Sequence, residues 1–322
     1  MNPGSPVHAI PDMFQPVSAP AEAIRQLWWL VGGISIGILL VVGGILWWCA
    51  THFRARPGED REPPQVYGSN QIEFAWTIVP VLIVLVLFLA TARTIYDVQA
   101  MVPPKDALEV TVVGHQWWWE IRYPGLGVVT ANELHVPASV PGARRPTFLT
   151  LESADVIHSF WVPQLAGKTD VVPARRNRMW VEPTETGTFL GQCAEFCGTQ
   201  HANMLLRVVV DSPADFAAWV EAQKRPAVAD PRVAVGRAVF ESTACVSCHT
   251  VAGTGADGTF GPDLTHLMSR ATIASGAADN APDRLRAWIV DPHAIKPGAL
   301  MPAMKLPDDQ VDAVTAYLST LR

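Results

Sequence analysis

The sequence predicts a multidomain membrane protein: a two-helix transmembrane hairpin, then a β-sandwich or small barrel, then a third, C-terminal unit. Two long apolar runs, a series of short strand-like segments and a short linker before a new pattern indicate this division. The chain has 322 residues, of which 49% are hydrophobic and only 17% are charged. This composition places part of the chain in lipid, and the length allows two or three domains.

The first 22 residues are rich in Pro, Ala and Ser and show no periodicity, so they predict an extended tail. They lack the basic start of a signal peptide. The formal net charge of the chain is −6, which argues against non-specific binding to nucleic acid. The same charge is compatible with a basic protein partner.

Residues 23–99 predict the hairpin, with helices over about 27–50 and 74–95. The first run carries no charge and is long enough to cross roughly 30 Å of hydrocarbon. A pair of tryptophans lies at each of its ends, as expected at a membrane interface. The second run includes Pro80 near its start and ends at Arg93.

The connecting loop sets the predicted orientation. Short loops that carry arginine remain in the cytoplasm. This loop contains Arg54, Arg56 and Arg61. We therefore expect both termini, and everything after Asp97, to lie on the periplasmic or extracellular side.

Residues 105–215 predict an all-β domain, because short runs rich in β-branched and aromatic residues alternate there with Pro and Gly. The runs are LEVTVVG, WWWEIRY, PTFLTLES, NRMWVEP, GTFLGQ and LLRVVVD. Several short strands of this kind favour a sandwich or a small barrel. A helix and linker follow over 216–230, the helix beginning after Ser212 as N-cap with Pro213 at its first position.

The stretch CAEFCGTQHANM contains an unusual set of metal-binding side chains, Cys193, Cys197, His201 and Met204. Two thiolates, an imidazole and a thioether are soft ligands that favour copper over magnesium or calcium. A second imidazole, His158, lies upstream in DVIHSFW. Because a mononuclear blue-copper site uses a single Cys, the leading interpretation is two copper ions held by two bridging thiolates. All of these residues are expected on loops of the β-domain.

Two simpler interpretations remain open for this stretch. The two Cys could form a disulfide, which would explain neither the His nor the Met. Zinc also binds Cys and His, but its structural sites rarely recruit Met.

The C-terminal unit, residues 231–322, contains CVSCH, the pattern by which c-type haem is attached. The thiols of Cys245 and Cys248 would bond the haem vinyl groups, and His249 would reach the iron. Zinc binding by CxxC alone is the alternative, but no second CxxC or HxxxH follows. Met301 and Met304 are candidates for the sixth iron ligand.

Two further features of this unit bear on its fold. Gly261 and Pro262 could present a backbone carbonyl to the proton of His249, which would fix the orientation of the imidazole. The last segment, DDQVDAVTAYLSTL, has apolar residues at helical spacing and predicts a packing helix.

Residues 21 to about 215 resemble subunit II of haem-copper cytochrome c oxidase, on the paired membrane helices, GHQWWW, DVIHSF and CAEFCGTQHANM. Residues 231–322 resemble a class I cytochrome c, on GRAVFESTACVSCHTV, GPDL, and DPHAIKPGALMPAM through AYL. The fusion is similar to subunit II of caa-type oxidases. The resemblance implies a cupredoxin-like sandwich and an all-α cytochrome domain.

The resemblance also implies a ligand set for a binuclear copper centre, CuA. Cys193 and Cys197 would bridge the two coppers, with His158, His201 and Met204 as terminal ligands. Glu195 would ligate copper through its carbonyl and bind, through its carboxylate, a magnesium ion shared with subunit I.

Three more roles are implied by the resemblance. Trp117 matches the residue at which electrons enter the family's subunit, and Glu73 matches the carboxylate at the mouth of a proton channel in subunit I. Alignment through PGALM selects Met301 over Met304 as the haem ligand. The middle tryptophan of WWW, Trp118, departs from the Tyr that many relatives have.

The function implied is an electron relay in a bacterial plasma membrane. Electrons would pass from cytochrome c or an upstream cytochrome complex through haem c and CuA to subunit I, which reduces oxygen to water and pumps protons. The alternatives are the CuA subunit of a haem-copper nitric oxide reductase and a membrane-anchored copper-delivery protein. A delivery protein would bind one copper and would usually lack a covalent haem, so both motifs argue against it.

Overall fold

A computed structural model describes residues 7–8, 11–54, 57–58, 62, 64–65, 67–105, 107–228 and 230–322. The chain divides into two compact units, one of residues 22–101 and one of Val102–Arg322 together with the residues before Glu22. The helices are α1 (Ala19–His52), α2 (Asn70–Gln99), α3 (Pro213–Gln223), α4 (Ala234–Ser242), α5 (Cys245–Cys248), α6 (Pro282–Val290), α7 (Pro292–Ile295) and α8 (Asp308–Leu318).

The strands are short and mostly precede α3. They are β1 (Val7–His8), β2 (Leu108–His115), β3 (Trp118–Tyr123), β4 (Val128–Ala131), β5 (Glu133–Pro137), β6 (Thr147–Ser153), β7 (His158–Trp161), β8 (Thr169–Val171), β9 (Asn177–Val181), β10 (Gly187–Cys193), β11 (Leu205–Asp211), β12 (Thr272–Ile273) and β13 (Ala278–Asp279).

The smaller unit holds two long apolar helices, α1 and α2. Their most apolar windows have mean hydropathies of 2.3 and 2.6, enough to cross a membrane by length and composition. Both helices extend beyond the predicted 27–50 and 74–95. Near its start α1 is polar, and Arg25 donates hydrogen bonds to Glu22 there, so the charge-free run marks only part of the helix.

The loop between these helices is only partly described. Arg54 follows α1, whereas Arg56 and Arg61 lie outside the described residues.

The described part of the N-terminal segment, which the sequence predicted as an extended tail, is attached to the β-domain. Val17 is buried, its N–H donates to the Gln164 carbonyl at 2.9 Å, and its carbonyl accepts from Thr184 N at 2.9 Å. β1 pairs in parallel with β10. Residues 1–6 and 9–10 lie outside the described residues. Backbone hydrogen bonds fix the described N-terminal residues on the β-domain. Amino-acid composition gives no information about such bonds.

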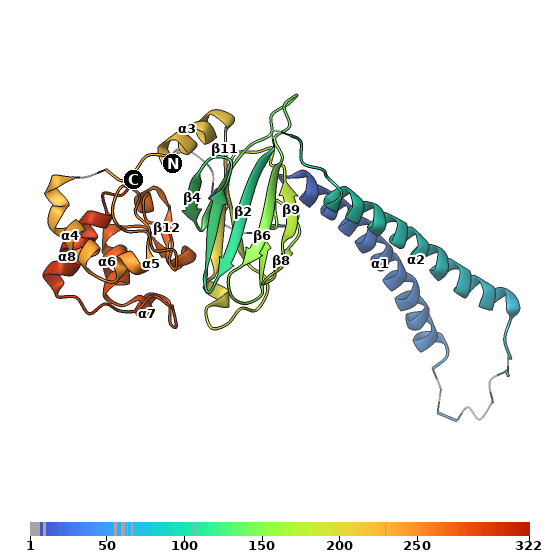
Figure 1. The fold of residues 1–322 in the computed structure, drawn as a ribbon. Coiled ribbons are helices and arrows are strands. Elements are labelled where there is room, and N and C mark those ends of the chain that lie inside the picture. The colour runs from blue at the N-terminus through green and yellow to red at the C-terminus, as the bar shows by residue number, and fades with distance from the viewer. Residues whose placement is uncertain are drawn as a thin grey trace. The chain divides into compact units, whose positions relative to one another are not determined.

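The β-domain is a sandwich of two sheets. One sheet has the order β5-β11-β10-β7-β8, with β1 on β10, and the other has the order β4-β3-β2-β6-β9. Figure 1 shows β2, β6 and β9 side by side in the second sheet. Alternate residues of β3, namely Trp119, Ile121 and Tyr123, are fully buried between the sheets, as expected for a strand with one buried face. All six predicted runs form strands.

Helix α3, which the sequence predicted ahead of a short linker, packs on the sandwich. Ser212 caps it by accepting a hydrogen bond from Asp215 N, as predicted. The Trp219 ring stacks on His135 of β5 at 4.2 Å between centroids. The β-domain therefore extends past the predicted end at residue 215, to about Gln223.

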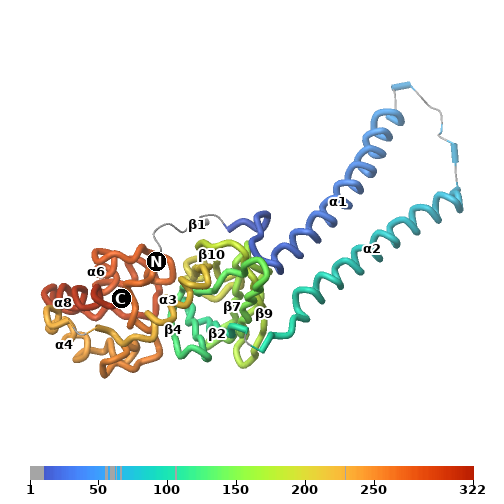
Figure 2. Tube along the Cα trace, turned by 90° about the horizontal axis from the view of Figure 1, so that it is seen from above, coloured from blue at the N-terminus to red at the C-terminus, as the bar shows by residue number. Residues whose placement is uncertain are grey.

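The C-terminal part is mainly helical, and α4, α6 and α8 gather around one core (Figure 2). Phe240 of α4 contacts Tyr317 of α8 with ring centroids 5.7 Å apart. A two-stranded ladder of β12 and β13 interrupts the helices, so the domain is not purely α-helical. The predicted last helix is α8.

Candidate copper centre and haem cavity

Pairing of β7 with β10 brings two predicted ligands together. Cys193 ends β10 opposite Phe160 of β7, and His158 begins β7. The prediction that all ligands lie on loops is therefore wrong for His158 and Cys193, because each occupies a strand end. Cys193 N donates to the Met204 carbonyl at 2.9 Å, which closes the loop 193–204 on itself.

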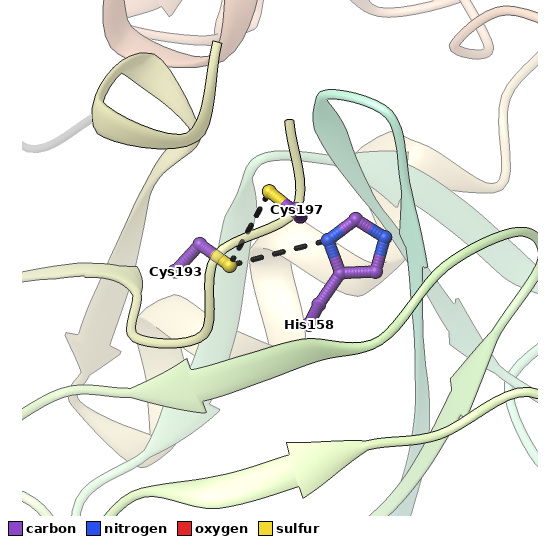
Figure 3. A group of neighbouring side chains, drawn as sticks. All are labelled: His158, Cys193 and Cys197. Carbon is purple, nitrogen blue, oxygen red and sulfur yellow. Dashed lines mark hydrogen bonds between the residues drawn. The ribbon is translucent and has the colours of Figure 1, made fainter. Parts of the chain in front are cut away.

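The five predicted side-chain ligands converge around the two thiols. The Cys193 and Cys197 sulfurs lie 3.8 Å apart, and Cys193 Sγ lies 3.9 Å from His158 Nδ1; Figure 3 shows these three side chains turned toward one another. Cys197 Sγ lies 3.6 Å from His201 Nδ1 and 3.8 Å from Met204 Sδ. Cys193 Sγ also lies 3.2 Å from the Glu195 carbonyl oxygen.

These distances decide between the interpretations left open by the sequence. All five cysteines fall in the described part of the chain, and none of them forms a disulfide. Each thiol has its own imidazole neighbour, and a fully buried thioether, Met204, completes the set. Such a soft, compact donor set fits two bridged coppers better than structural zinc.

The two thiols influence each other's acidity. The hydrogen bond between them is the main cause that lowers the pKa of Cys193 and raises the pKa of Cys197. Both thiols must lose their protons to bind metal as thiolates.

Asp155, which the sequence did not single out, orients the first histidine. Its Oδ1 lies 2.8 Å from His158 Nε2, and its Oδ2 accepts from Gln116 N at 2.6 Å. An Nε2–H donated to Asp155 leaves Nδ1, the atom nearest Cys193, free to bind metal. The sequence motif DVIHSF already contains Asp155, three residues before His158.

The predicted electron-accepting residue, Trp117, lies against the thiol loop. Its indole Nε1 donates to the Cys197 carbonyl at 2.9 Å, and Gln116 Nε2 donates to the same oxygen at 2.7 Å. The neighbouring Trp118 stacks on His115 with centroids 4.3 Å apart. The backbone between β2 and β3 is thus tied directly to a ligand residue.

Two predicted residues stand apart from the side-chain cluster. Glu195 is half-buried, and its carbonyl rather than its carboxylate approaches Cys193. Glu73 lies exposed in the first turn of α2, in the other unit, where its own carbonyl accepts from Thr77 Oγ1 at 2.8 Å.

The attachment motif forms one wall of an apolar cavity. Cys245 and Cys248 lie on α5, and both line the cavity with His249, Met301 and Met304. His249 Nδ1 lies 2.8 Å from the Pro262 carbonyl, the contact that the sequence suggested. Burial lowers the pKa of His249 despite this carbonyl, and this direction favours the neutral imidazole, the form that binds metal.

Gly261 is required where it stands. A Cβ on this residue would lie 2.5 Å from the His249 ring. The cavity contains both methionines, and its geometry alone does not select between Met301 and Met304.

Arg270 is a cavity residue that the sequence gave no reason to select. It is 7% exposed, and its Nε has no hydrogen-bond partner among the described residues. Burial lowers the pKa of Arg270, with Asp263 opposing the shift. A buried cation with an unsatisfied donor favours a nearby anion, and the carboxylates of a bound haem would supply one. The lining therefore fits haem c.

Comparison with known families agrees with this geometry. Family models match at residues 9–92 (cytochrome c oxidase subunit II, transmembrane domain), 140–212 (its periplasmic domain) and 233–322 (cytochrome c). Cytochrome c oxidase subunit 2 of Alkalihalophilus pseudofirmus is 33% identical over 92% of this chain and 88% of its own length. The chain belongs to the cytochrome c oxidase subunit II family.

Further relatives agree. Cytochrome c oxidase subunit 2 of Bacillus sp. strain PS3 is 35% identical, over 84% of this chain and 80% of the relative. The crystal structure of the periplasmic domain of subunit II from Bradyrhizobium japonicum matches with 34% identity, 38% coverage of this chain, 97% of that chain and a TM-score of 0.35.

Family membership confirms the predicted fold class and the predicted role in electron transfer to an oxidase. The periplasmic domain implies CuA and the cytochrome domain implies haem c. The chain is a membrane protein with two transmembrane helices and a periplasmic domain. As a subunit of the oxidase it works in a complex with subunit I. The copper-delivery alternative is left without support.

Proposed function

We propose that this chain accepts electrons from a c-type cytochrome on its cytochrome domain and passes them through the sandwich domain to subunit I. There oxygen is reduced to water and protons are pumped. The supporting observation is that the Gln116–Trp118 segment both lines the cavity of the cytochrome domain and donates two hydrogen bonds to the Cys197 carbonyl. One backbone segment thus touches both sites.

The chain's residues hold and shield the carriers. When bound, haem c and the copper pair supply groups that gain and lose one electron. Asp155 and Pro262 hold His158 and His249 in one orientation each, and rigid ligands limit rearrangement on reduction. Phe240, Leu264 and Trp288 make the cavity wall apolar, which excludes water.

The cytochrome domain and the sandwich domain are joined on one chain, so electron transfer between them needs no diffusional encounter of two separate proteins. The linker after α3 is short, so the cytochrome domain is held at a high effective concentration near residues 193–204, which we call the copper loop. The physiological donor then needs to dock only on the cytochrome domain.

The finer assignments rest on the family resemblance and on composition. We propose CuA ligation by Cys193, Cys197, His158, His201 and Met204, with Met301 as the haem ligand and Trp117 as the point of electron transfer into the sandwich. Glu195 would bind magnesium at the junction with subunit I, and Glu73 would stand at the mouth of a proton channel. Arg54 supports a cytoplasmic position for the loop between α1 and α2, in a bacterial plasma membrane.

A double variant tests the order of the relay. Cys245→Ala/Cys248→Ala in the assembled oxidase removes haem attachment and should leave the copper absorbance intact, while oxidation of an external cytochrome is lost. Cys49→Ala, an exposed thiol on α1, is the matched control and should retain full turnover. Full turnover in the double variant would refute the proposed order.

Copper content gives an independent check against the delivery alternative. Two coppers per chain with a mixed-valence spectrum support the relay, and one copper per chain contradicts it.

A further inference from the structure

A buried lysine joins the cytochrome domain to the copper loop. Lys296 follows α7 and is only 3% exposed. Its Nζ donates to three backbone carbonyls: Trp117 at 2.7 Å, Asn203 at 2.8 Å and Ala274 at 3.0 Å. No carboxylate among the described residues forms an ion pair with it. A lysine is rarely buried without a paired charge, so its three carbonyl contacts call for an explanation.

One of the two sandwich carbonyls belongs to the loop 193–204, and the other belongs to a residue hydrogen-bonded to that loop. Trp117 donates its indole N–H to the Cys197 carbonyl, and Asn203 directly precedes Met204. The next residue adds a second contact, because the Pro297 carbonyl accepts from Gln200 Nε2 at 2.6 Å. Gln200 is buried and lies on the copper loop, next to His201.

On its other side the same segment reaches the haem cavity. Ala299 N donates to the Lys296 carbonyl at 3.0 Å, which forms a tight turn. Ala299, Leu300 and Met301 line the cavity, as Lys296 itself does. Residues 296–301 therefore run from the copper loop to the cavity wall that carries the proposed haem ligand.

Other contacts hold the two domains together without Lys296. Glu133 accepts from Ala271 N at 2.7 Å, and Ser275 Oγ donates to the Leu205 carbonyl at 2.8 Å. These bonds fix the segment 271–276 on the sandwich. Lys296 is thus not the sole attachment, and its contacts lie where the two cofactor sites approach each other.

We infer that Lys296 is a positioning residue, which holds the methionine-bearing loop of the cytochrome domain in register with the copper loop and so sets the rate of electron transfer between the domains. The inference rests on the relay proposed above. Three donors on one flexible side chain match three carbonyls from separate segments, whereas an apolar side chain would leave all three carbonyls unsatisfied.

The test compares Lys296→Met with Lys305→Met in the assembled oxidase. Both changes remove a charge at nearly constant length, and Lys305 is exposed in the same domain. A photoreductant injects an electron into the cytochrome domain, and the absorbance of each cofactor is followed. For Lys296→Met we expect transfer between the domains to slow by about tenfold or more, since small misplacements are costly. Lys305→Met should match the wild type.

Two further readouts separate positioning from damage. The absorption spectra and reduction potentials of both cofactors should be unchanged in Lys296→Met, while amide hydrogen exchange should rise in segments 115–118 and 200–204. Lys296→Gln retains two donors and should recover part of the rate; it replaces the Met variant if that variant fails to bind its cofactors. The inference is overturned if Lys296→Met, or Lys296→Gln where it replaces the Met variant, transfers electrons between the domains at the wild-type rate.

The outcome for the wild type distinguishes the two proposals. If the wild-type complex shows no transfer from the cytochrome domain to the copper centre, the relay itself is wrong. If the wild type transfers and Lys296→Met transfers equally fast, only the positioning role is wrong.

Discussion

At the scale of single residues, the Asp155 carboxylate determines which nitrogen of His158 faces the thiols. Asp155→Asn should weaken copper binding about 10–100-fold, because partners of metal-bound histidines typically contribute this much. The amide can turn its N–H toward the ring and favour the wrong tautomer. Competition between the full chain and a copper chelator measures the effect.

The control for this prediction is Asp170→Asn, since Asp170 is exposed on β8. It should bind copper like the wild type. Equal copper affinity in Asp155→Asn and Asp170→Asn would show that the Asp155 contact does not orient the ligand.

The sequence predicted which side chains could bind the cofactors. It did not predict the hydrogen bonds that position the segments carrying them. Cys193, Cys197 and His249 stand in motifs whose spacing carries their roles. Lys296 is separated by 179 positions from Trp117, whose carbonyl it contacts. A backbone carbonyl has no sequence signature, so this contact was not visible in the sequence.

At the scale of elements, the crossing of α4 and α8 depends on Gly236. A Cβ there would lie 1.9 Å from the Ala313 carbonyl oxygen, in the backbone of α8. Gly236→Ala must therefore push the helices apart, and we expect a loss of about 1–3 kcal/mol of stability in the cytochrome domain. Thermal unfolding of the full chain, followed by haem absorbance, measures it.

Gly255→Ala is the matched control for this crossing. It adds the same methyl group in the same domain, where nothing lies within 4 Å of the new Cβ. An unfolding temperature of Gly236→Ala equal to that of Gly255→Ala would mean that the two helices do not approach so closely.

Two strands that the sequence did not predict, β5 and β7, show where hydrophobic periodicity fails to identify a strand. All five residues of β5 are buried, because α3 covers this strand, with Trp219 stacked on His135. A strand buried on both faces shows no alternation of polar and apolar residues. β7 is only four residues long, too short to establish a period, although it begins with the predicted copper ligand His158.

At the scale of the whole molecule, the two cofactor motifs and the apolar runs were enough to divide the chain. The attachment of one part to another was not predictable, because it rests on long-range contacts such as Ala271 N with the Glu133 carboxylate. The same holds for the N-terminal segment, whose strand β1 pairs with β10 through its backbone.

The orientation of the chain in the membrane is the last property that can be tested as a whole. Lys224 and Arg232 are exposed between α3 and α4, so trypsin should cut there. In right-side-out vesicles, external trypsin should release the cytochrome domain, whereas cleavage at Arg54 should require inverted vesicles, because we expect the arginine-bearing loop to lie in the cytoplasm. A Lys224→Gln/Arg232→Gln variant should resist release, which would confirm the cutting sites. Release of the domain only from inverted vesicles would reverse the assigned topology and place the copper centre on the wrong side for an external donor.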